Sequence, residues 1–245
     1  MLFVKLVELY ARYGFTIRSS ISPFLLTKLS LDSREDGTFT YAFREGTNIG
    51  NLGGGISMSE VALIEDVGQV YAPKRIFAIG CSFGWSTLAL ALAMPQAKIV
   101  AIDIGMGNGK EGLALTNQIA KENGLAVTGV LGASPDDLAA TVQAHLDGPV
   151  DMVFIDADHT NEAQNKDYFG IRPHCASDAV YMFHDVMVCQ MLPSFKEIAA
   201  ATPTHKARVL TRTASGIGLL VPKDSHGDLH RVLDAYCDPY GTVPV

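Results

Sequence analysis

The sequence predicts an α/β fold: a doubly wound, mostly parallel, seven-stranded sheet with a terminal antiparallel hairpin strand and an N-terminal helical extension. Five short apolar runs alternate with helical patterns from residue 75 onward, which favours successive β/α units. These runs are apolar on both faces, as in parallel strands that helices cover on both sides. Two further runs flank Ser215-Gly216, and this spacing is typical of an antiparallel pair.

The N-terminal segment differs in composition from the rest of the chain. Residues 2–13 carry apolar side chains at helical spacing. Residues 31–55 are rich in charged residues and glycine, which predicts a loop or flap with little core of its own. We therefore expect a segment over 1–55, which either covers the site or forms a homodimer contact, and one domain over 56–245. The sequence does not decide between these two roles.

The predicted elements of the domain follow in order along the chain. Ser57 precedes Glu60 by three residues, which predicts the start of a helix that runs to about Tyr71. The predicted strands are 75–80, 98–103, 126–131, 150–155, 179–183, 207–211 and 217–221. After the third strand, Ser134 is expected to cap a helix with Pro135 in its first position.

Charge and composition exclude several classes of protein. The chain has 245 residues, a net charge of −7 and no basic cluster, so nucleic-acid binding by phosphate neutralisation is not expected. No apolar run reaches the roughly 18–20 residues of a membrane span, and we find no signal-peptide pattern. The four cysteines form no C-x-x-C pair. We therefore expect reduced thiols in a cytoplasmic protein.

Residues with ligand-binding chemistry follow the first two predicted strands, whose carboxyl ends should meet at one edge of the sheet. Gly80 and Gly84 allow a tight turn close to a ligand. Ser82, Ser86 and the loop amides can hold a carboxylate, although the segment is not a G-x-G-x-x-G fingerprint and a packing turn is the alternative. Asp103 lies 23 residues after Gly80 and is suited to accept hydrogen bonds from both hydroxyls of a ribose. The alternative is that it is a surface carboxylate.

The fourth and fifth predicted strands end in ionisable side chains. One apolar run leads into Asp156-Ala157-Asp158-His159, and the next ends in His184-Asp185. Buried charges need partners, so these groups are expected to share a task. An oxygen-rich set suits Mg²⁺, Ca²⁺ or Mn²⁺, and the imidazole of His184 favours Mn²⁺, Fe²⁺ or Zn²⁺. A hydrogen-bonded Asp–His pair without metal is the alternative.

Four segments together carry a family resemblance. They are Ala78 to Ser86, similar to E-[IL]-G-x-x-x-G-Y-S; Val127 to Ser134, similar to a strand ending in G-A-S; Asp151 to His159, similar to D-[ML]-V-F-[IV]-D-A-D-K; and Phe183-His184-Asp185. On these motifs, residues 56–190 resemble class I S-adenosylmethionine-dependent methyltransferases with a Rossmann-like sheet. In particular, they resemble the catechol and caffeoyl-CoA O-methyltransferase type and methyltransferase family 24. The chain departs from the pattern at Ala78, at Pro135 and at His184-Asp185.

The resemblance implies a site for S-adenosylmethionine and for a metal such as Mg²⁺ or Mn²⁺. The implied cofactor residues are Gly80, Cys81, Ser82, Gly84, Ser86, Asp103, Ile104, Gly132, Ala133, Ser134 and Asp156, and the implied metal ligands are Asp156, His184 and Asp185. Ala133 and Ser134 would line the adenine. His159 stands where metal-dependent relatives have a catalytic lysine, and an imidazole is a natural base near neutral pH.

These expectations lead to one function and two alternatives. The first is transfer of a methyl group from S-adenosylmethionine to a hydroxyl of a small molecule, such as a catechol, a phenolic or a natural-product sugar. His159 or His184 would be the catalytic base, with or without a divalent metal. The alternatives are a nicotinamide-dependent oxidoreductase and a non-catalytic relative that binds a nucleotide or a partner protein.

Overall fold

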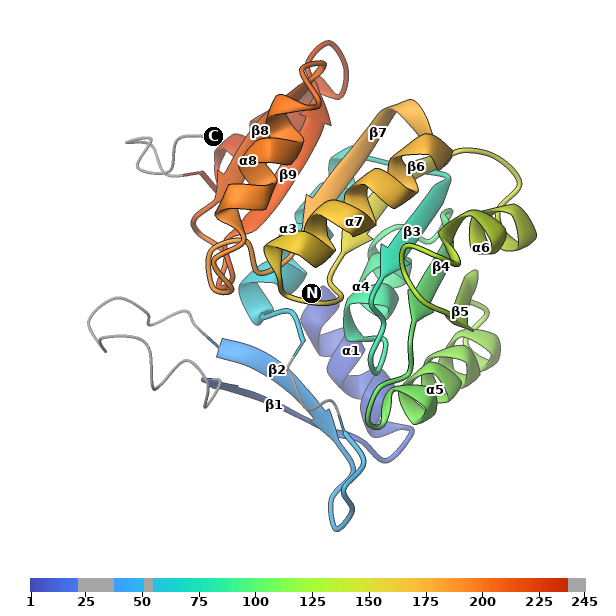
Figure 1. The fold of residues 1–245 in the computed structure, drawn as a ribbon. Coiled ribbons are helices and arrows are strands. Elements are labelled where there is room, and N and C mark those ends of the chain that lie inside the picture. Colours follow the sequence, from blue (N-terminus) through green and yellow to red (C-terminus); the bar gives the residue numbers. More distant parts are fainter. Residues whose placement is uncertain (22–37, 51–54, 238–245) are drawn as a thin grey trace.

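A seven-stranded sheet forms the centre of the computed structural model, which describes residues 1–21, 38–50 and 55–237 (Figure 1). The strand order is β5-β4-β3-β6-β7-β9-β8. The strands are β3 (Arg75–Ile79), β4 (Lys98–Asp103), β5 (Val127–Leu131), β6 (Val150–Ile155), β7 (Cys175–Phe183), β8 (His205–Leu210) and β9 (Ile217–Pro222). The first five of these strands are mutually parallel, which confirms the predicted fold class.

The antiparallel strand lies inside the sheet rather than at its edge. Strand β9 pairs antiparallel with β7 on one side and with β8 on the other. Because β8 is antiparallel to β9, it runs in the same direction as the parallel strands and forms the edge. The hairpin around Ser215-Gly216 is therefore as predicted, but its second strand is inserted between the first strand and β7.

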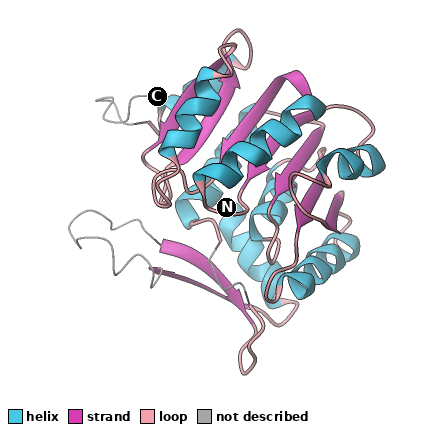
Figure 2. Ribbon diagram, viewed as in Figure 1, coloured by secondary structure: helices cyan, strands magenta, loops and turns pink. Residues whose placement is uncertain are grey.

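Helices cover both faces of the sheet and give three layers (Figure 2). One face packs against α1 (Leu2–Ala11), α3 (Met58–Val70), α4 (Trp85–Ala93), α5 (Gly109–Glu122) and α9 (Gly227–Asp234). The other face packs against α6 (Leu138–His145), α7 (Asn161–Ile171) and α8 (Leu192–Ala200), and a 3₁₀ turn, η2 (Arg172–His174), follows α7. Strands such as β3 contribute alternate residues to the two cores, Ile76 and Ala78 to one and Phe77 and Ile79 to the other.

The start of α3 agrees with its sequence signal, and the start of α6 does not. Ser57 caps α3 in a reciprocal capping box with Glu60, which is the role that the three-residue spacing predicts. Helix α6 begins only at Leu138, with Asp137 at its N-cap. The hydroxyl of Ser134 instead donates to Asp167 Oδ1 of α7 at 2.5 Å. The prediction that Ser134 caps this helix is wrong because a tertiary partner takes its side chain.

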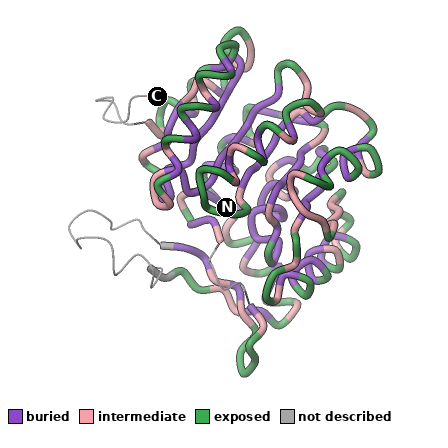
Figure 3. The backbone as a smooth tube through the Cα atoms, viewed as in Figure 1, coloured by how far each residue is buried: buried purple, intermediate pink, exposed green. Residues whose placement is uncertain are grey.

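Residues 38–43 form a strand where the sequence predicts loop or flap. Strand β2 (Thr38–Phe43) pairs antiparallel with β1 (Thr16–Ile21) in a separate two-stranded sheet. Alternating threonines and aromatic residues favour a strand here, and the partner comes from a distant part of the sequence. Of the predicted loop, residues 31–37 and 51–54 lie outside the described residues. The burial pattern in Figure 3 shows that β2 has buried residues while the turn after it is exposed.

The strand order locates a crevice for ligands. From β3 the chain moves to β4 and β5 on one side, and then to β6 and β7 on the other. The direction of winding therefore reverses between β3 and β6. In open α/β sheets, ligands bind outside the carboxyl ends of the strands at this reversal.

Candidate functional site

The loop after β3 passes directly over the end of β6. Gly80 has φ = +93°, and a Cβ atom there would overlap the carbonyl oxygen of Asp156. Only glycine allows this backbone approach. Gly84 also has positive φ, at the N-cap of α4, and a Cβ atom there would overlap the side chain of Thr116. The two glycines predicted for a tight turn are thus both required by the path of the loop.

Asp103 holds this loop by its backbone. Its Oδ2 accepts hydrogen bonds from the amides of Cys81 at 2.9 Å and Ser82 at 2.7 Å, and its Oδ1 accepts from the amide of Gly105 at 2.7 Å. Ser82 is exposed and has φ = +48° although it is not a glycine. A residue held in this region by its surroundings is a feature of functional sites. The structure thus brings the first and second predicted site segments together.

Two predicted cofactor residues have buried side chains. Cys81 contacts Thr116 and Thr87 through its sulfur, and burial raises the pKa of its thiol to about 11. The thiol is therefore un-ionised at neutral pH. Ser86 is buried in the first turn of α4.

The third strand end lies beside the second. The amide of Gly132 donates to the Asp103 carbonyl at 2.9 Å, and the amide of Ala133 donates to Asp137 Oδ2 at 2.8 Å. Ile104 and Leu131 are both 55% exposed and leave an apolar surface at this edge. Gly132 therefore adjoins Asp103, which brings the second and third predicted site segments together.

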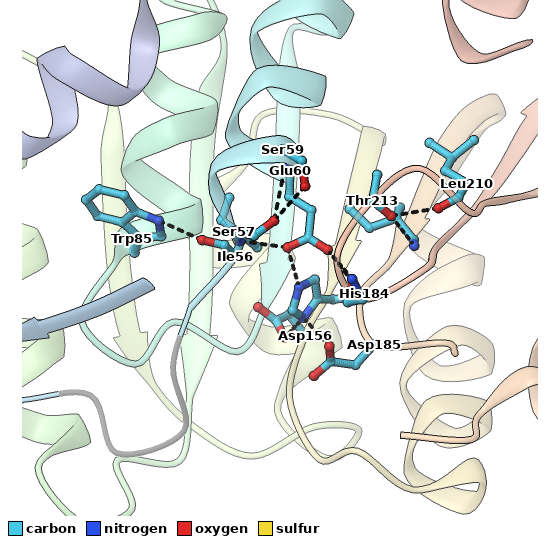
Figure 4. A network of polar contacts seen from close by, with 12 residues as sticks. Ile56, Ser57, Ser59, Glu60, Trp85, Asp156, His184, Asp185, Leu210 and Thr213 are labelled. Carbon is cyan, nitrogen blue, oxygen red and sulfur yellow. Dashed lines mark hydrogen bonds and ion pairs between the residues drawn. The ribbon is translucent and has the colours of Figure 1, made fainter. Parts of the chain in front are cut away.

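Four ionisable side chains gather at the ends of β6 and β7, namely Asp156, His159, His184 and Asp185. Figure 4 shows three of them, Asp156, His184 and Asp185. From each of the four, one potential ligand atom lies within 4.8 Å of those of the others. His184 Nδ1 is 3.0 Å from Asp156 Oδ1 and 3.4 Å from Asp185 Oδ1. His159 Nε2 is 3.4 Å from both Asp156 Oδ1 and Asp185 Oδ2. The tertiary structure thus unites the two charged strand ends that the sequence singles out.

The charges in this cluster shift one another's pKa values. Burial by itself lowers the pKa of the His184 imidazole, but the surrounding carboxylates raise it well above its ordinary value. Burial raises the pKa of Asp156, but the charge of His184 and a hydrogen bond with His159 lower it below its usual range. For His159 the hydrogen bond with Asp156 and the nearby charge of Asp185 outweigh burial and raise the pKa. The cluster thus favours ionised carboxylates facing cationic partners.

Two atoms of the cluster fit a cation. His184 Nδ1 and Asp185 Oδ1 are buried and have no hydrogen-bond partner among the described residues. Asp185 also has φ = +57°, which aims its carboxylate from a sparsely populated backbone conformation. Buried polar atoms without partners are costly, and one imidazole with two carboxylates is a donor set that divalent cations accept. The residues present therefore fit the predicted metal.

Glu60 is a member of the site that sequence reasoning did not assign to it. This fully buried residue of α3 lies 3.1 Å from His184 Nε2 through its Oε2 atom. Burial raises the pKa of Glu60, but the charge of His184 and hydrogen bonds from His184, Ser215 and Ser57 lower it to about 2. The sequence identifies Glu60 only as the acidic residue of a capping box with Ser57. That pattern predicts the hydrogen bond with Ser57 but not the one with the His184 imidazole.

The fold and this arrangement of strand ends agree with the resemblance that the sequence motifs carry, and three comparisons bear on it. Residues 77–186 match a family described as a methyltransferase domain. The chain has no match among curated proteins. Among solved structures, a putative caffeoyl-CoA O-methyltransferase from Staphylococcus aureus has 16% identity and a TM-score of 0.56, covering 68% of this chain and 84% of that chain.

Two further structures are similar. An O-methyltransferase from Bacillus cereus in complex with SAH has 21% identity and a TM-score of 0.55, covering 68% of this chain and 82% of that chain. The second is the O-methyltransferase TomG from Streptomyces achromogenes, which is involved in tomaymycin synthesis and is in complex with SAM. It has 20% identity and a TM-score of 0.54, covering 68% of this chain and 81% of that chain. At these identities the likeness shows the fold.

Residues 77–186 thus match a methyltransferase-domain family, and the resemblance to methyltransferase family 24 is confirmed over those residues. The match favours a methyltransferase over the nicotinamide-dependent oxidoreductase. None of the helices in the described ranges is long and apolar enough to span a lipid bilayer.

Proposed function

We propose that this protein transfers a methyl group from S-adenosylmethionine to a hydroxyl oxygen of a small molecule, assisted by a divalent cation such as Mg²⁺ or Mn²⁺. The acceptor class is a catechol, a phenolic or a hydroxylated natural product. The observation that carries the proposal is the contact of two sites at one edge of the sheet. Gly80 of the loop held by Asp103 lies against the backbone of Asp156, which belongs to the charged cluster.

The cofactor side of the site is supported by the loop and by the neighbouring strand ends. The exposed Ser82 and the turn around Gly80 offer polar groups to the methionine end. Asp103 has accepted one amide on Oδ1 and two on Oδ2, and Oδ1 keeps acceptor capacity for a ribose hydroxyl. The exposed apolar side chains of Ile104 and Leu131 provide a surface for an adenine ring.

The cation side is supported by the atoms that lack protein partners. Asp156, His184 and Asp185 would hold the ion. When bound, a divalent cation lowers the pKa of a coordinated hydroxyl and orients it. His184 is only 3% exposed and is engaged by Glu60, which favours its role as ligand over its role as base.

His159 is the base that we propose. Its side chain is 41% exposed, so an acceptor hydroxyl can reach it. Asp156 and Asp185 flank its Nε2 atom and stabilise the imidazolium that forms when it takes the proton. In the reaction the acceptor oxygen attacks the sulfonium methyl carbon, the C–S bond breaks, and S-adenosylhomocysteine leaves. The hydroxyl proton passes to His159, and alignment of oxygen, carbon and sulfur supplies much of the acceleration.

Isothermal titration with S-adenosylmethionine and S-adenosylhomocysteine tests the cofactor half of the proposal. Binding of both is expected, and absence of binding by both would refute it. A panel of catechols and phenolics, followed by mass spectrometry for a gain of one methyl group, tests the transfer. If activity survives exhaustive chelation, the cation has no part in the mechanism, and only the proposed base His159 remains.

The location we propose is the cytoplasm, in keeping with four free cysteines.

A further inference from the structure

We propose that Glu60 is a positioning residue: it keeps a hydrogen on Nε2 of His184 and thereby leaves Nδ1 as the atom with which His184 binds the cation. This inference rests on the proposed function, because it concerns the same cluster. It assigns a role to a residue on α3, whose sequence neighbours take no part in the four-residue cluster.

The partners of Glu60 are hydrogen-bond donors. Its Oε2 accepts from the amide of Ser57 at 2.7 Å, and its Oε1 accepts from the amide of Ser215 at 2.9 Å and from the Ser215 hydroxyl. Two of these groups are backbone amides, which can only donate. The carboxylate is thus held from α3 and from the turn between β8 and β9. A group surrounded by donors acts as an acceptor toward its remaining neighbour, which is His184 Nε2 at 3.1 Å.

The two nitrogens of His184 therefore face different partners. Nε2 points to Glu60, and Nδ1 points toward Asp156 and Asp185, as Figure 4 shows. A neutral imidazole has one donor nitrogen and one acceptor nitrogen. Because Glu60 requires a donor on Nε2, the neutral, metal-binding form of His184 carries its lone pair on Nδ1. In the cationic form that Asp156 and Asp185 favour, both nitrogens are protonated, and Nδ1 is the one whose proton a cation replaces. That is the nitrogen that has no hydrogen-bond partner among the described residues.

The opposite tautomer would need a proton on Glu60 and a hydrogen on Nδ1. It would replace charge-assisted hydrogen bonds from two backbone amides with weaker ones to a neutral acid. It would also direct an N–H group at the place where a cation must bind. Carboxylates that orient ligating histidines in this way support metal affinity, and their removal typically lowers that affinity about 10–100-fold.

Nitrogen NMR of histidine-labelled protein reads the tautomer directly, without cofactor, acceptor or metal. At a pH high enough that the imidazolium has lost one proton, we expect the Nε2 resonance of His184 in the metal-free wild type at the position of a protonated ring nitrogen and the Nδ1 resonance at that of an unprotonated one. His184→Ala assigns the signal. An unprotonated Nε2 in the wild type would overturn the inference, and this reading needs no variant of Glu60 that folds.

Glu60→Gln tests whether Glu60 causes the preference. The amide has nearly the same shape but one oxygen in place of two, so it cannot accept both from Ser57 and His184 on one side and from Ser215 on the other. We expect a population with unprotonated Nε2 to appear, and Mn²⁺ affinity, followed by the electron paramagnetic resonance of free Mn²⁺, to fall about 10–100-fold. Unchanged tautomer and unchanged affinity in a folded variant would contradict the role.

Ser57→Ala is the matched control. It removes the side-chain cap of α3, which costs about 1 kcal/mol, but keeps the Ser57 amide and the Glu60 carboxylate. Mn²⁺ affinity within twofold of the wild type is expected, and an equal loss in both variants would reduce Glu60 to a structural role. Titration with S-adenosylhomocysteine separates the two hypotheses. If the wild type binds S-adenosylhomocysteine but its neutral His184 has an unprotonated Nε2, only the role of Glu60 is refuted. If Nε2 is protonated but the wild type does not bind S-adenosylhomocysteine, only the proposed methyltransferase function is refuted.

Discussion

Asp103 and Asp185 both follow parallel strands, yet their surroundings are opposite. Asp103 is partly exposed, and three backbone amides satisfy its carboxylate. Asp185 is buried, its backbone has positive φ, and its Oδ1 has no hydrogen-bond partner among the described residues. Backbone amides satisfy the first carboxylate, whereas the second faces the imidazoles of the cluster and keeps one oxygen without a hydrogen bond.

This difference separates organisation from chemistry. A carboxylate bound by backbone amides fixes the shape of a loop and changes little when a ligand arrives. A buried carboxylate oxygen without a hydrogen bond is stabilised when a ligand reaches it. We therefore expect substitutions at the two positions to affect different measured quantities.

The largest effect is expected for Asp185→Asn. The variant removes one anionic ligand of the proposed cation, which contributes several kcal/mol of charge stabilisation, so turnover should fall about 10³-fold. Mn²⁺ affinity should fall with it, while the dissociation constant of S-adenosylhomocysteine should stay within about threefold. Steady-state kinetics and calorimetry measure the two quantities. Full turnover in this variant would remove Asp185 from the reaction.

His159→Ala should lower turnover about 100-fold, because a general base contributes at least that much. The base must be neutral to accept a proton, so wild-type turnover should rise as pH rises through the raised pKa of His159. The variant should lose that limb of the profile. His159→Gln serves as the control of similar size, and near-normal turnover in either variant would clear His159 of the role.

Asp103→Asn should act on binding and stability rather than on chemistry. Hydrogen bonds to a charged group contribute about 1.5–3 kcal/mol, so S-adenosylhomocysteine should bind at least about tenfold more weakly. The melting temperature should fall because the loop amides lose their anionic acceptor. Mn²⁺ affinity should be unchanged. A variant that lost Mn²⁺ binding but kept the cofactor product would reverse the comparison.

Asp167→Asn has the smallest expected effect. The Asp167 carboxylate is intermediate between those of Asp103 and Asp185, because it is buried but accepts a hydrogen bond from Ser134. Burial, with a smaller contribution from Asp158, raises the pKa of Asp167 to about 6, against the hydroxyl of Ser134. The folded state therefore binds a proton that the unfolded chain releases near pH 4. As pH falls from about 7.5 to 5, the wild type should gain roughly 1–2 kcal/mol of stability relative to the variant. Urea unfolding at several pH values measures this, and parallel curves would contradict it.

Local patterns were sufficient for most of the fold. Strands β3 to β9 lie within a few residues of their predicted ranges. Most of them are short runs that are apolar on both faces, and this pattern is typical of strands that helices cover on both sides. The loop predicted over 31–55 was wrong at β2, because its pairing partner lies in β1. The cap predicted at Ser134 was wrong because Asp167, more than thirty residues later, takes its hydroxyl.

The sequence by itself determined the alternating α/β order, the glycines of the loop after β3 and the acids and imidazoles at the strand ends. These features depend on residue type and short spacing. Only the tertiary structure decided which of those groups meet, that β9 inserts between β7 and β8, and that Glu60 reaches His184 across 124 residues. The physical reason is that burial and hydrogen-bond partners depend on contacts between distant segments, which no local pattern encodes.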